Sequence, residues 1–128
     1  MIGNNTMKKI LLVDDDPNTT QLLETILSKD GYQVMSVNES QQALPAALRF
    51  FPDLILLDLM MPVMDGIATC RILRADPNFV KTPILFFTAL GDIDNKVAAY
   101  EAGATDFFTK PIHPAELRLK IKALVNKG

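Results

Sequence analysis

Four apolar runs of strand length each lead into side chains that can do acid, base or metal chemistry. In chain order these side chains are Asp14 and Asp15, Asp58, Thr88 and Lys110. A carboxylate at the end of a buried strand is costly to ionise, so it needs a cation or hydrogen-bond donors nearby. If the runs form one parallel sheet, their carboxyl ends share one edge, where ligands of such folds bind. The five side chains would then surround one shallow pocket.

Such a pocket would hold three carboxylates, which repel one another unless protons or a cation neutralise them. Lys110 offers one positive charge, which is too little for three anions. A cluster of oxygen ligands suits Mg²⁺, which keeps several waters and often binds phosphate oxygens, and Mn²⁺ meets the same requirement. An aspartate beside such a metal can attack a phosphoryl group and form an acyl phosphate. The Lys110 ammonium and the Thr88 hydroxyl would then contact oxygens of the transferred group.

Segments of strand length alternate with segments of helix length, and these elements must position the pocket. Strands are predicted over residues 9–13, 32–37, 53–57, 83–87 and 104–109. Helices are predicted from Pro17 up to a stop at Gly31, over 39–50, 66–75 and 92–102, and from Pro114 onward. Five strand–helix units with right-handed crossovers predict an α/β fold: a doubly wound, five-stranded parallel sheet with helices on both faces.

Particular residues are expected to begin or interrupt these helices. Asp16 is the predicted N-cap of the first helix, Asp65 is a second structural cap, and Asn38 is the predicted cap of the helix over 39–50. Pro45 lies inside that helix and should kink it or weaken one turn. The sequence therefore predicts an irregular second helix.

The composition is that of one globular domain. The chain has 128 residues, of which 48% are hydrophobic and 22% charged, enough to bury a core. A net charge of −2 provides no basic field for nucleic acid or an anionic membrane. The single cysteine, Cys70, has no partner for a disulfide, and no run is long enough to span a membrane, so the expected location is cytoplasmic. Residues 1–7 lack the apolar stretch of a signal peptide and are expected to form a flexible leader.

Four segments closely resemble the motifs of response-regulator receiver domains, in order and in spacing. They are ILLVDDDP at 10–17, LLDLMMPVMDG at 56–66, FTA at 87–89 and GATDFFTKP at 103–111. The resemblance extends from about Lys8 into the last helix, so residues 8–128 are expected to form one receiver domain. It implies the flavodoxin-like strand order 2-1-3-4-5.

The resemblance also implies how the pocket works. Asp58 would accept a phosphoryl group from a histidine kinase or a histidine phosphotransfer protein. Asp15, Asp58 and the backbone carbonyl of Met60 would bind Mg²⁺ directly, with Asp14 acting mainly through water. Thr88 and Lys110 would hold phosphoryl oxygens, and the bond between Lys110 and the proline after it is expected to be cis.

In this family, phosphorylation changes a binding face made by the fourth helix, the fifth strand and the last helix. Phe107 stands at the position of the family's switch aromatic, which swings inward when the threonine moves. Lys96 and Tyr100 are further candidates for that face. The expected partners are an output domain or protein of unknown kind and, after phosphorylation, a second copy of the chain, with no direct contact to nucleic acid or membrane.

Two apolar residues occupy positions that tune the lifetime of the phosphoryl group in the family. These are Met60, two residues after Asp58, and Leu90, two residues after Thr88. Neither side chain can orient an attacking water through a hydrogen bond. We therefore expect slow self-hydrolysis.

Three other functions compete with that of a signalling receiver, which catalyses only its own phosphorylation and dephosphorylation. A Mg²⁺-dependent aspartyl-phosphate phosphatase would need an acid–base carboxylate two residues after its nucleophile, where this chain has Met60. A flavin carrier would need a hydroxyl- and glycine-rich phosphate loop after the first strand, where three acids stand instead. A receiver that only binds partners would not need the five pocket residues, all of which are present.

Ordinary structural roles would explain several pocket residues if each stood alone. Asp14 and Asp15 could belong to the acidic N-terminus of a helix. Thr88 could be a common strand residue and Lys110 a solvated lysine. Their predicted convergence at one sheet edge favours the functional interpretation.

Overall fold

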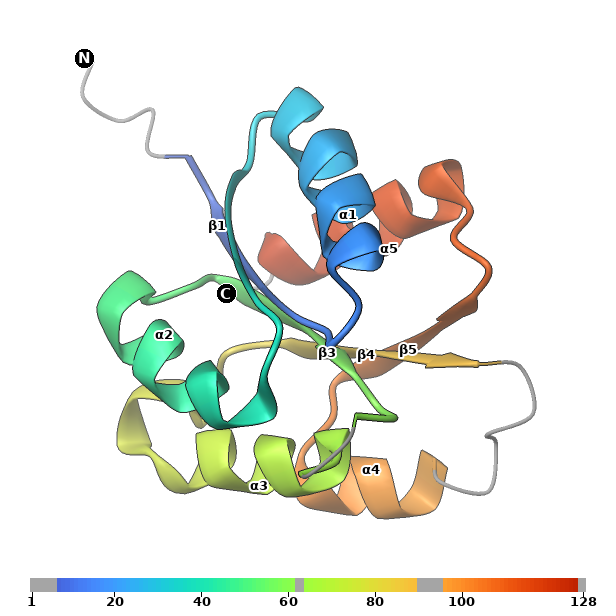
Figure 1. The fold of residues 1–128 in the computed structure, drawn as a ribbon. Helices are drawn as coiled ribbons and strands as arrows, with labels where there is room; N and C mark the ends of the chain where they lie inside the picture. The colour runs from blue at the N-terminus through green and yellow to red at the C-terminus, as the bar shows by residue number, and fades with distance from the viewer. Residues whose placement is uncertain (1–6, 62–63, 90–95, 127–128) are drawn as a thin grey trace.

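The computed structural model contains the predicted five-stranded parallel sheet, with helices on both faces (Figure 1). It describes residues 7–61, 64–89 and 96–126. The strands are β1 (Lys9–Val13), β2 (Gln33–Val37), β3 (Leu54–Asp58), β4 (Ile84–Ala89) and β5 (Asp106–Lys110). Their order in the sheet is β2-β1-β3-β4-β5, which confirms the order that the resemblance implied.

Five α-helices connect or follow these strands. They are α1 (Pro17–Lys29), α2 (Ala43–Phe50), α3 (Gly66–Ala75), α4 (Lys96–Ala102) and α5 (Pro114–Val125). Two short 3₁₀ turns, η2 (Ser40–Gln42) and η3 (Pro77–Phe79), precede α2 and follow α3. Residues 92–95, the predicted start of the fourth helix, lie outside the described part of the chain. No helix among the described residues is long and apolar enough to cross a membrane.

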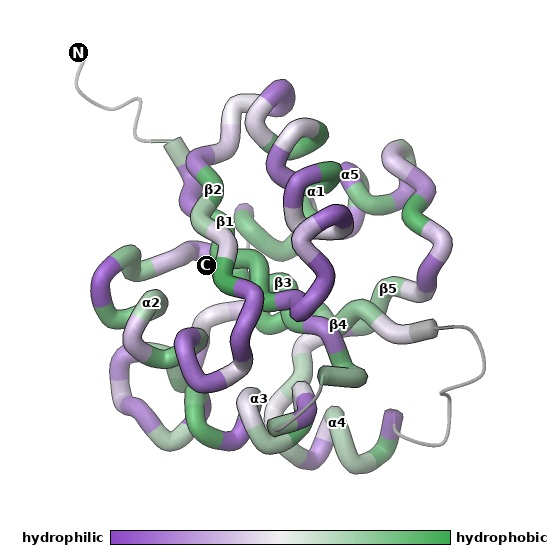
Figure 2. Tube along the Cα trace, in the orientation of Figure 1, coloured by the Kyte–Doolittle hydropathy of each residue, from purple (hydrophilic) through white to green (hydrophobic). Residues whose placement is uncertain are grey.

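Alternate residues of each strand enter two separate cores. On β1, Leu11 and Val13 pack toward α2, α3 and α4, whereas Ile10 and Leu12 pack toward α1 and α5. All four side chains are at most 1% exposed. Figure 2 shows the central strands largely in hydrophobic colours, whereas the surrounding helices contain both hydrophilic and hydrophobic residues. A central strand buried on both faces leaves its ends as the place for polar side chains.

The last three strands, β3, β4 and β5, reach one or two residues further toward this edge than predicted, whereas β1 and β2 end where predicted. Asp58 is the last residue of β3 and pairs with Phe87, and Thr88 pairs with Thr109 inside the ladder of β4 and β5. Lys110 closes β5 opposite Ala89. Backbone pairing continues past the apolar runs, because it depends on the neighbouring strand and not on the side chain.

The second helix differs from the prediction. It begins at Ala43 after the turn η2, and Asn38 does not cap it. Pro45 therefore lies in the first turn of α2, where a missing N–H breaks no helical hydrogen bond. The prediction that it would lie in the interior and kink the helix was wrong. By contrast, Asp16 and Asp65 cap α1 and α3 through their side chains, as predicted.

The start of α3 packs directly on the end of β3. A Cβ atom added at Gly66 would lie 2.3 Å from the Asp58 carbonyl oxygen and 2.8 Å from the Leu59 Cα. The Gly66 N–H also donates to the Leu59 carbonyl at 2.9 Å. Glycine is thus required for the close approach that holds the chain beside Asp58.

We predict that Gly66→Ala lowers the free energy of unfolding by about 3 kcal/mol, because backbone atoms must move to admit the methyl group. Urea unfolding measures the change. Gly31→Ala is the control, since no atom lies within 4 Å of its added Cβ and only the backbone angle, φ +90°, is unfavourable. That variant should lose about 1 kcal/mol. Equal losses would contradict close packing at Gly66.

Candidate functional site

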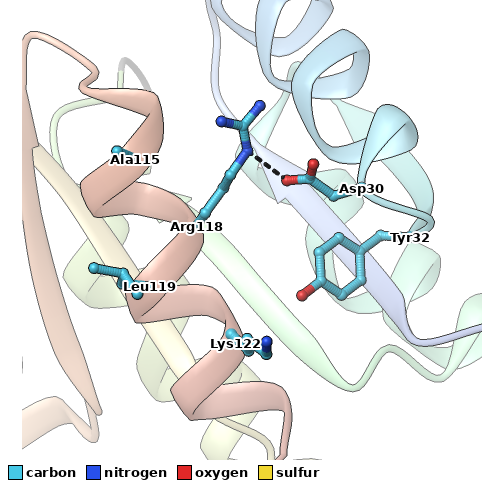
Figure 3. Close-up of a pocket in the computed structure, with 6 residues that line it drawn as sticks. All are labelled: Asp30, Tyr32, Ala115, Arg118, Leu119 and Lys122. Atoms are coloured by element: carbon cyan, nitrogen blue, oxygen red, sulfur yellow. Dashed lines mark hydrogen bonds and ion pairs between the residues drawn. The ribbon is translucent and has the colours of Figure 1, made fainter.

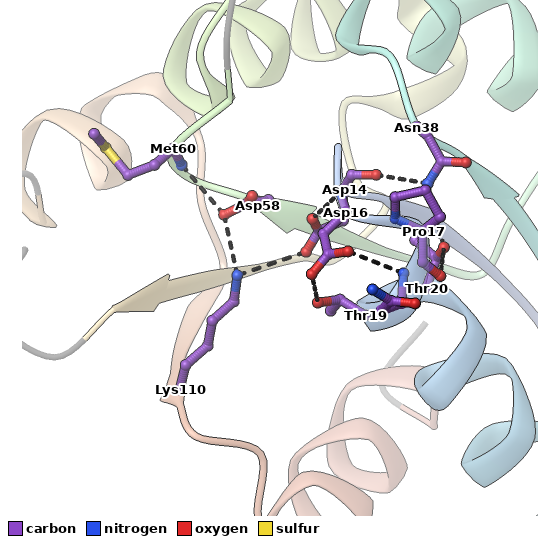
Figure 4. A network of polar contacts seen from close by, with 10 residues as sticks. Asp14, Asp16, Pro17, Thr19, Thr20, Asn38, Asp58, Met60 and Lys110 are labelled. Atoms are coloured by element: carbon purple, nitrogen blue, oxygen red, sulfur yellow. Dashed lines mark hydrogen bonds and ion pairs between the residues drawn. The ribbon is translucent and has the colours of Figure 1, made fainter.

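The sheet brings the predicted pocket residues to one edge. Asp14 follows β1, Asp58 ends β3, Thr88 lies near the end of β4 and Lys110 ends β5. The exposed fractions of Asp14, Asp58 and Thr88 are 2%, 5% and 3%. Asp15 is exposed at the rim of this group. Figure 4 shows Asp14, Asp58 and Lys110 pointing toward one another from the ends of three strands, β1, β3 and β5.

Three carboxylates meet there with one ammonium group. One oxygen each from Asp14, Asp15 and Asp58 lie within 4.8 Å of one another. The Lys110 Nζ lies 3.6 Å from the Asp14 Oδ2 and 3.7 Å from the Asp58 Oδ1 (Figure 4). The lysine therefore neutralises part of the charge without a close hydrogen bond to either partner.

Backbone N–H groups hold both buried carboxylates in place. The Asp16 N–H donates to the Asp14 Oδ1 at 2.9 Å, and the Met60 N–H donates to the Asp58 Oδ1 at 3.2 Å. Asp16 itself accepts from the Asn18 N–H, which is its capping role. Each buried carboxylate is thus aimed by the loop that follows its strand.

The structure gives Asn38 a contact that sequence reasoning missed. Its side-chain amide donates to the Asp14 carbonyl oxygen and to the Thr20 hydroxyl, not to the start of a helix. An asparagine after a strand offers no local signal for such a bond, since its partners lie 24 and 18 residues away in the sequence.

Burial raises the pKa values of both enclosed carboxyl groups. The pKa of Asp58 is raised to about 7, first by burial and then by the negative charge of Asp14. The pKa of Asp14 is also raised by burial, although its hydrogen bond from Asp16 acts in the opposite direction. Lys110 lowers both pKa values but does not cancel the effect of burial. The cluster of Asp14, Asp15, Asp58 and Lys110 therefore has more negative than positive charge when its carboxyl groups are ionised.

The donor set fits a hard divalent cation. The Asp14 Oδ2 is buried and accepts no hydrogen bond from any described residue. A buried carboxylate oxygen in this state is costly unless a ligand supplies the missing contact. Carboxylate oxygens from three residues, one of them exposed to solvent, match the preference of Mg²⁺ for few protein ligands and several waters.

Phe107 lies inward, 5% exposed, on the side of the sheet that α3 and α4 cover. Its ring stacks on Phe86 with centroids 5.7 Å apart and meets the edge of Tyr100 at 5.1 Å. The Lys96 Nζ lies 5.6 Å from the centre of the Phe107 ring. Tyr100 is 47% exposed, so among these residues it contributes most visibly to the surface. Leu90 lies outside the described residues.

Two hollows in the surface differ in their relation to this site. A hollow of about 210 Å³ is lined by Leu59, Met60, Met61, Asp65 and Ile67, directly after Asp58. A larger one, of about 600 Å³, lies between α5 and the segment joining α1 to β2 (Figure 3). It contains an ion pair between Arg118 and Asp30, at 2.8 Å, but none of the predicted site residues. The larger of these two hollows is therefore not the one beside the carboxylate group.

Fold and site together define a flavodoxin-like α/β protein with an acidic pocket at the carboxyl edge of its sheet. Residues 10–122 match the response regulator receiver domain family, so the chain belongs to that family. A putative response regulator from Chloroflexus aurantiacus has the same fold, with a TM-score of 0.89 and 36% identity over 94% of this chain and 99% of that one.

Two further relatives are informative about the site and the architecture. One is the receiver domain of the sensor histidine kinase PA1611 from Pseudomonas aeruginosa, which is 33% identical with a TM-score of 0.86 over 94% of this chain and 99% of that one. The structure of that domain holds a magnesium ion in its active-site cleft. The DNA-binding response regulator MtrA of Mycolicibacterium smegmatis is 40% identical over 97% of this chain and 54% of its own length. The chain spans about half the length of the curated relatives it matches.

We predict that Asp58→Asn stabilises the metal-free chain at neutral pH by about 2 kcal/mol. The pKa of Asp58 is about 7 in the folded chain against an ordinary 3.8, so its carboxyl makes folding less favourable as the pH rises through this range. The gain from asparagine should shrink as the pH falls from about 7 and should vanish below about pH 4, where the carboxyl is protonated in both states. Urea unfolding in EDTA across this pH range measures the effect.

Asp65→Asn is the matched control, because Asp65 is an exposed cap of α3 and asparagine caps helices equally well. Its stability should stay within about 0.5 kcal/mol of the wild type at each pH. If Asp58→Asn is instead less stable than the wild type at neutral pH, the prediction is wrong, because interactions in the folded chain would then outweigh the cost of burying the Asp58 charge.

Proposed function

We propose that the chain is the phosphoacceptor switch of a two-component system or phosphorelay, with Asp58 as the acceptor. The observation that carries this proposal is the group of three carboxylates and one ammonium at the end of β3, with Asp58 between Lys110 and the Met60 N–H. A histidine kinase or a histidine phosphotransfer protein supplies the phosphoryl group. Residues 8–128 form the receiver domain, after a leader at 1–7.

In the reaction, one Asp58 carboxylate oxygen attacks the phosphorus of a phosphohistidine. The P–O bond forms as the P–N bond breaks, and the imidazole nitrogen keeps the electron pair. Asp15, Asp58 and the Met60 carbonyl would hold Mg²⁺ or Mn²⁺, with Asp14 acting through water. The metal, when bound, offsets charge on the phosphoryl oxygens.

The remaining residues of the pocket bind and orient the transferred group. The Met60 N–H holds the carboxylate of Asp58 by its Oδ1, which leaves the Oδ2 to react. Lys110 already lies within 4 Å of this carboxylate and can move its ammonium to a phosphoryl oxygen. Thr88 would hold a second phosphoryl oxygen.

Phosphorylation would then shift the domain between two states and change the face of α4, β5 and α5. Phe107 is the switch aromatic in this proposal, and Tyr100 and Lys96, which contact its ring, carry the change to the surface. This face would bind an output domain or partner protein, or a second phosphorylated copy. We expect no direct contact with nucleic acid or membrane from this domain.

Chemical phosphorylation tests the assignment of Asp58. We expect acetyl phosphate with Mg²⁺ to add the mass of one phosphoryl group to the wild type and none to Asp58→Asn. EDTA should prevent the reaction, and beryllofluoride should give a Mg²⁺-dependent fluorine signal that the variant lacks. A chain that no donor modifies, with or without Mg²⁺, would instead be a binding-only receiver. Repeated phosphate release from simple phosphoesters would identify a phosphatase.

The apolar residues at 60 and 90 predict a long-lived phosphoryl group. Met60 is 58% exposed beside Asp58, and its thioether cannot direct a water at the phosphorus. Met60→Asn combined with Leu90→Glu should shorten the half-life about tenfold or more. Loss of the phosphoryl group is followed by mass spectrometry after the donor is removed. Equal half-lives would refute the explanation, and Val97→Asn, an exposed change on α4, controls for added polarity.

A further inference from the structure

One side chain outside the carboxylate cluster holds the backbone from which two of its members project. Asn38, in the loop after β2, donates its amide to the Asp14 carbonyl oxygen at 2.8 Å and to the Thr20 hydroxyl at 3.2 Å. That hydroxyl donates in turn to the Pro17 carbonyl at 3.1 Å, and Thr20 is 4% exposed. Both amide protons of Asn38 are therefore used, one after β1 and one on the first turn of α1 (Figure 4).

These bonds fix the peptide plane between Asp14 and Asp15. The Asp14 N–H donates to the Val37 carbonyl at 3.2 Å, and the Asp14 carbonyl accepts from Asn38. Two consecutive residues at the end of β2 thus bond both backbone groups of Asp14. The Asp15 nitrogen belongs to the same planar unit as the Asp14 carbonyl. A rotation of this plane would move the Asp15 carboxylate relative to its neighbours.

We propose that Asn38 is a positioning residue of the metal site, which fixes this peptide plane and so sets the geometry in which the carboxylates bind Mg²⁺. The inference rests on the proposed function of the pocket. Mg²⁺ demands near-octahedral geometry and tolerates little displacement of a ligand. Groups that orient metal ligands typically change metal affinity by about ten- to hundredfold when they are removed. Thr20 belongs to the same unit, since it accepts the second amide proton.

A purely structural role for Asn38 predicts a different result, and Ser36 provides the comparison. The Ser36 hydroxyl donates to the Glu24 carboxylate and so also ties β2 to α1. It has no hydrogen bond to Asp14 or Asp15. Loss of the Ser36 bond should lower stability as loss of the Asn38 bonds does, but it should leave the metal site intact.

Calorimetric titration of the unphosphorylated chain with MgCl₂ measures the Kd for Mg²⁺, and urea unfolding in EDTA measures stability. Asn38→Leu keeps the side-chain shape without hydrogen-bonding groups and should raise the Kd about tenfold. Ser36→Ala should leave the Kd unchanged. Thr20→Val should raise the Kd by a smaller factor than Asn38→Leu does. In the double variant, the Kd should rise by less than the product of the two single effects, since both changes break the same hydrogen-bonded unit.

An unchanged Kd in Asn38→Leu would overturn this inference but not the proposed function. Equal increases of the Kd in Asn38→Leu and Ser36→Ala would also overturn it, because they would indicate a general loss of rigidity between β2 and α1. A wild-type chain that binds no Mg²⁺ would overturn the proposed function together with the inference. If Asn38→Leu does not fold, Thr20→Val decides: a raised Kd supports the positioning role, and an unchanged one contradicts it.

Discussion

Repulsion among buried carboxylates is the constraint on which the rest of this structure depends. Asp14 and Asp58 are almost fully enclosed, Asp15 lies beside them, and Lys110 provides the nearby positive charge. A domain that is stable by only about 5–15 kcal/mol keeps such a cluster only if the surrounding structure gives the chain no way to separate the charges. The sheet meets this condition, because β1, β3 and β4 are fixed by pairing on both sides.

The same sheet explains why the chemistry lies at its edge and not within it. Strands buried on both faces admit only apolar side chains along their length, as β3 shows with four consecutive apolar residues before Asp58. Polar groups can appear where the strands end, and parallel strands end together. The loops then orient these side chains. N–H groups from Asp16 and Met60 donate to the carboxylates of Asp14 and Asp58, and the Asn38 amide donates to the carbonyl of the peptide bond between Asp14 and Asp15.

Sequence reasoning succeeded where a residue's role follows from its place in a strand or at a helix start. The apolar runs predicted the sheet, and their polar ends predicted which side chains would meet. The caps at Asp16 and Asp65 were predictable because a cap contacts residues only a few positions away. The strand order came from the resemblance, since periodicity does not tell which strands are neighbours.

The failures concern contacts between distant segments. Asn38 looks like a helix cap in the sequence, but tertiary structure offers it the Asp14 carbonyl and the Thr20 hydroxyl instead. The start of α2 then moves to Ala43, which places Pro45 in a first turn that tolerates it. The sequence left open whether Phe107 fills the core or acts as a switch, since its inward position depends on Phe86 and Tyr100, which no spacing in the sequence brings together.

The alternation of strand side chains connects the charged edge to the packed face in a way that suits a switch. Thr88 and Phe86 are two residues apart on β4 and therefore point to the same face, where Phe86 stacks on Phe107. A ligand shifts an equilibrium between two states only by the difference in its affinity for them. The uncompensated charge of this pocket is negative, so it favours the state in which a bound cation neutralises the carboxylates best. In the proposed switch, a rearrangement of Thr88 that improves this neutralisation would also act on the aromatic pair on the same face. The electrostatic cost of the carboxylate cluster would then increase the difference in free energy between the two states that a ligand can produce.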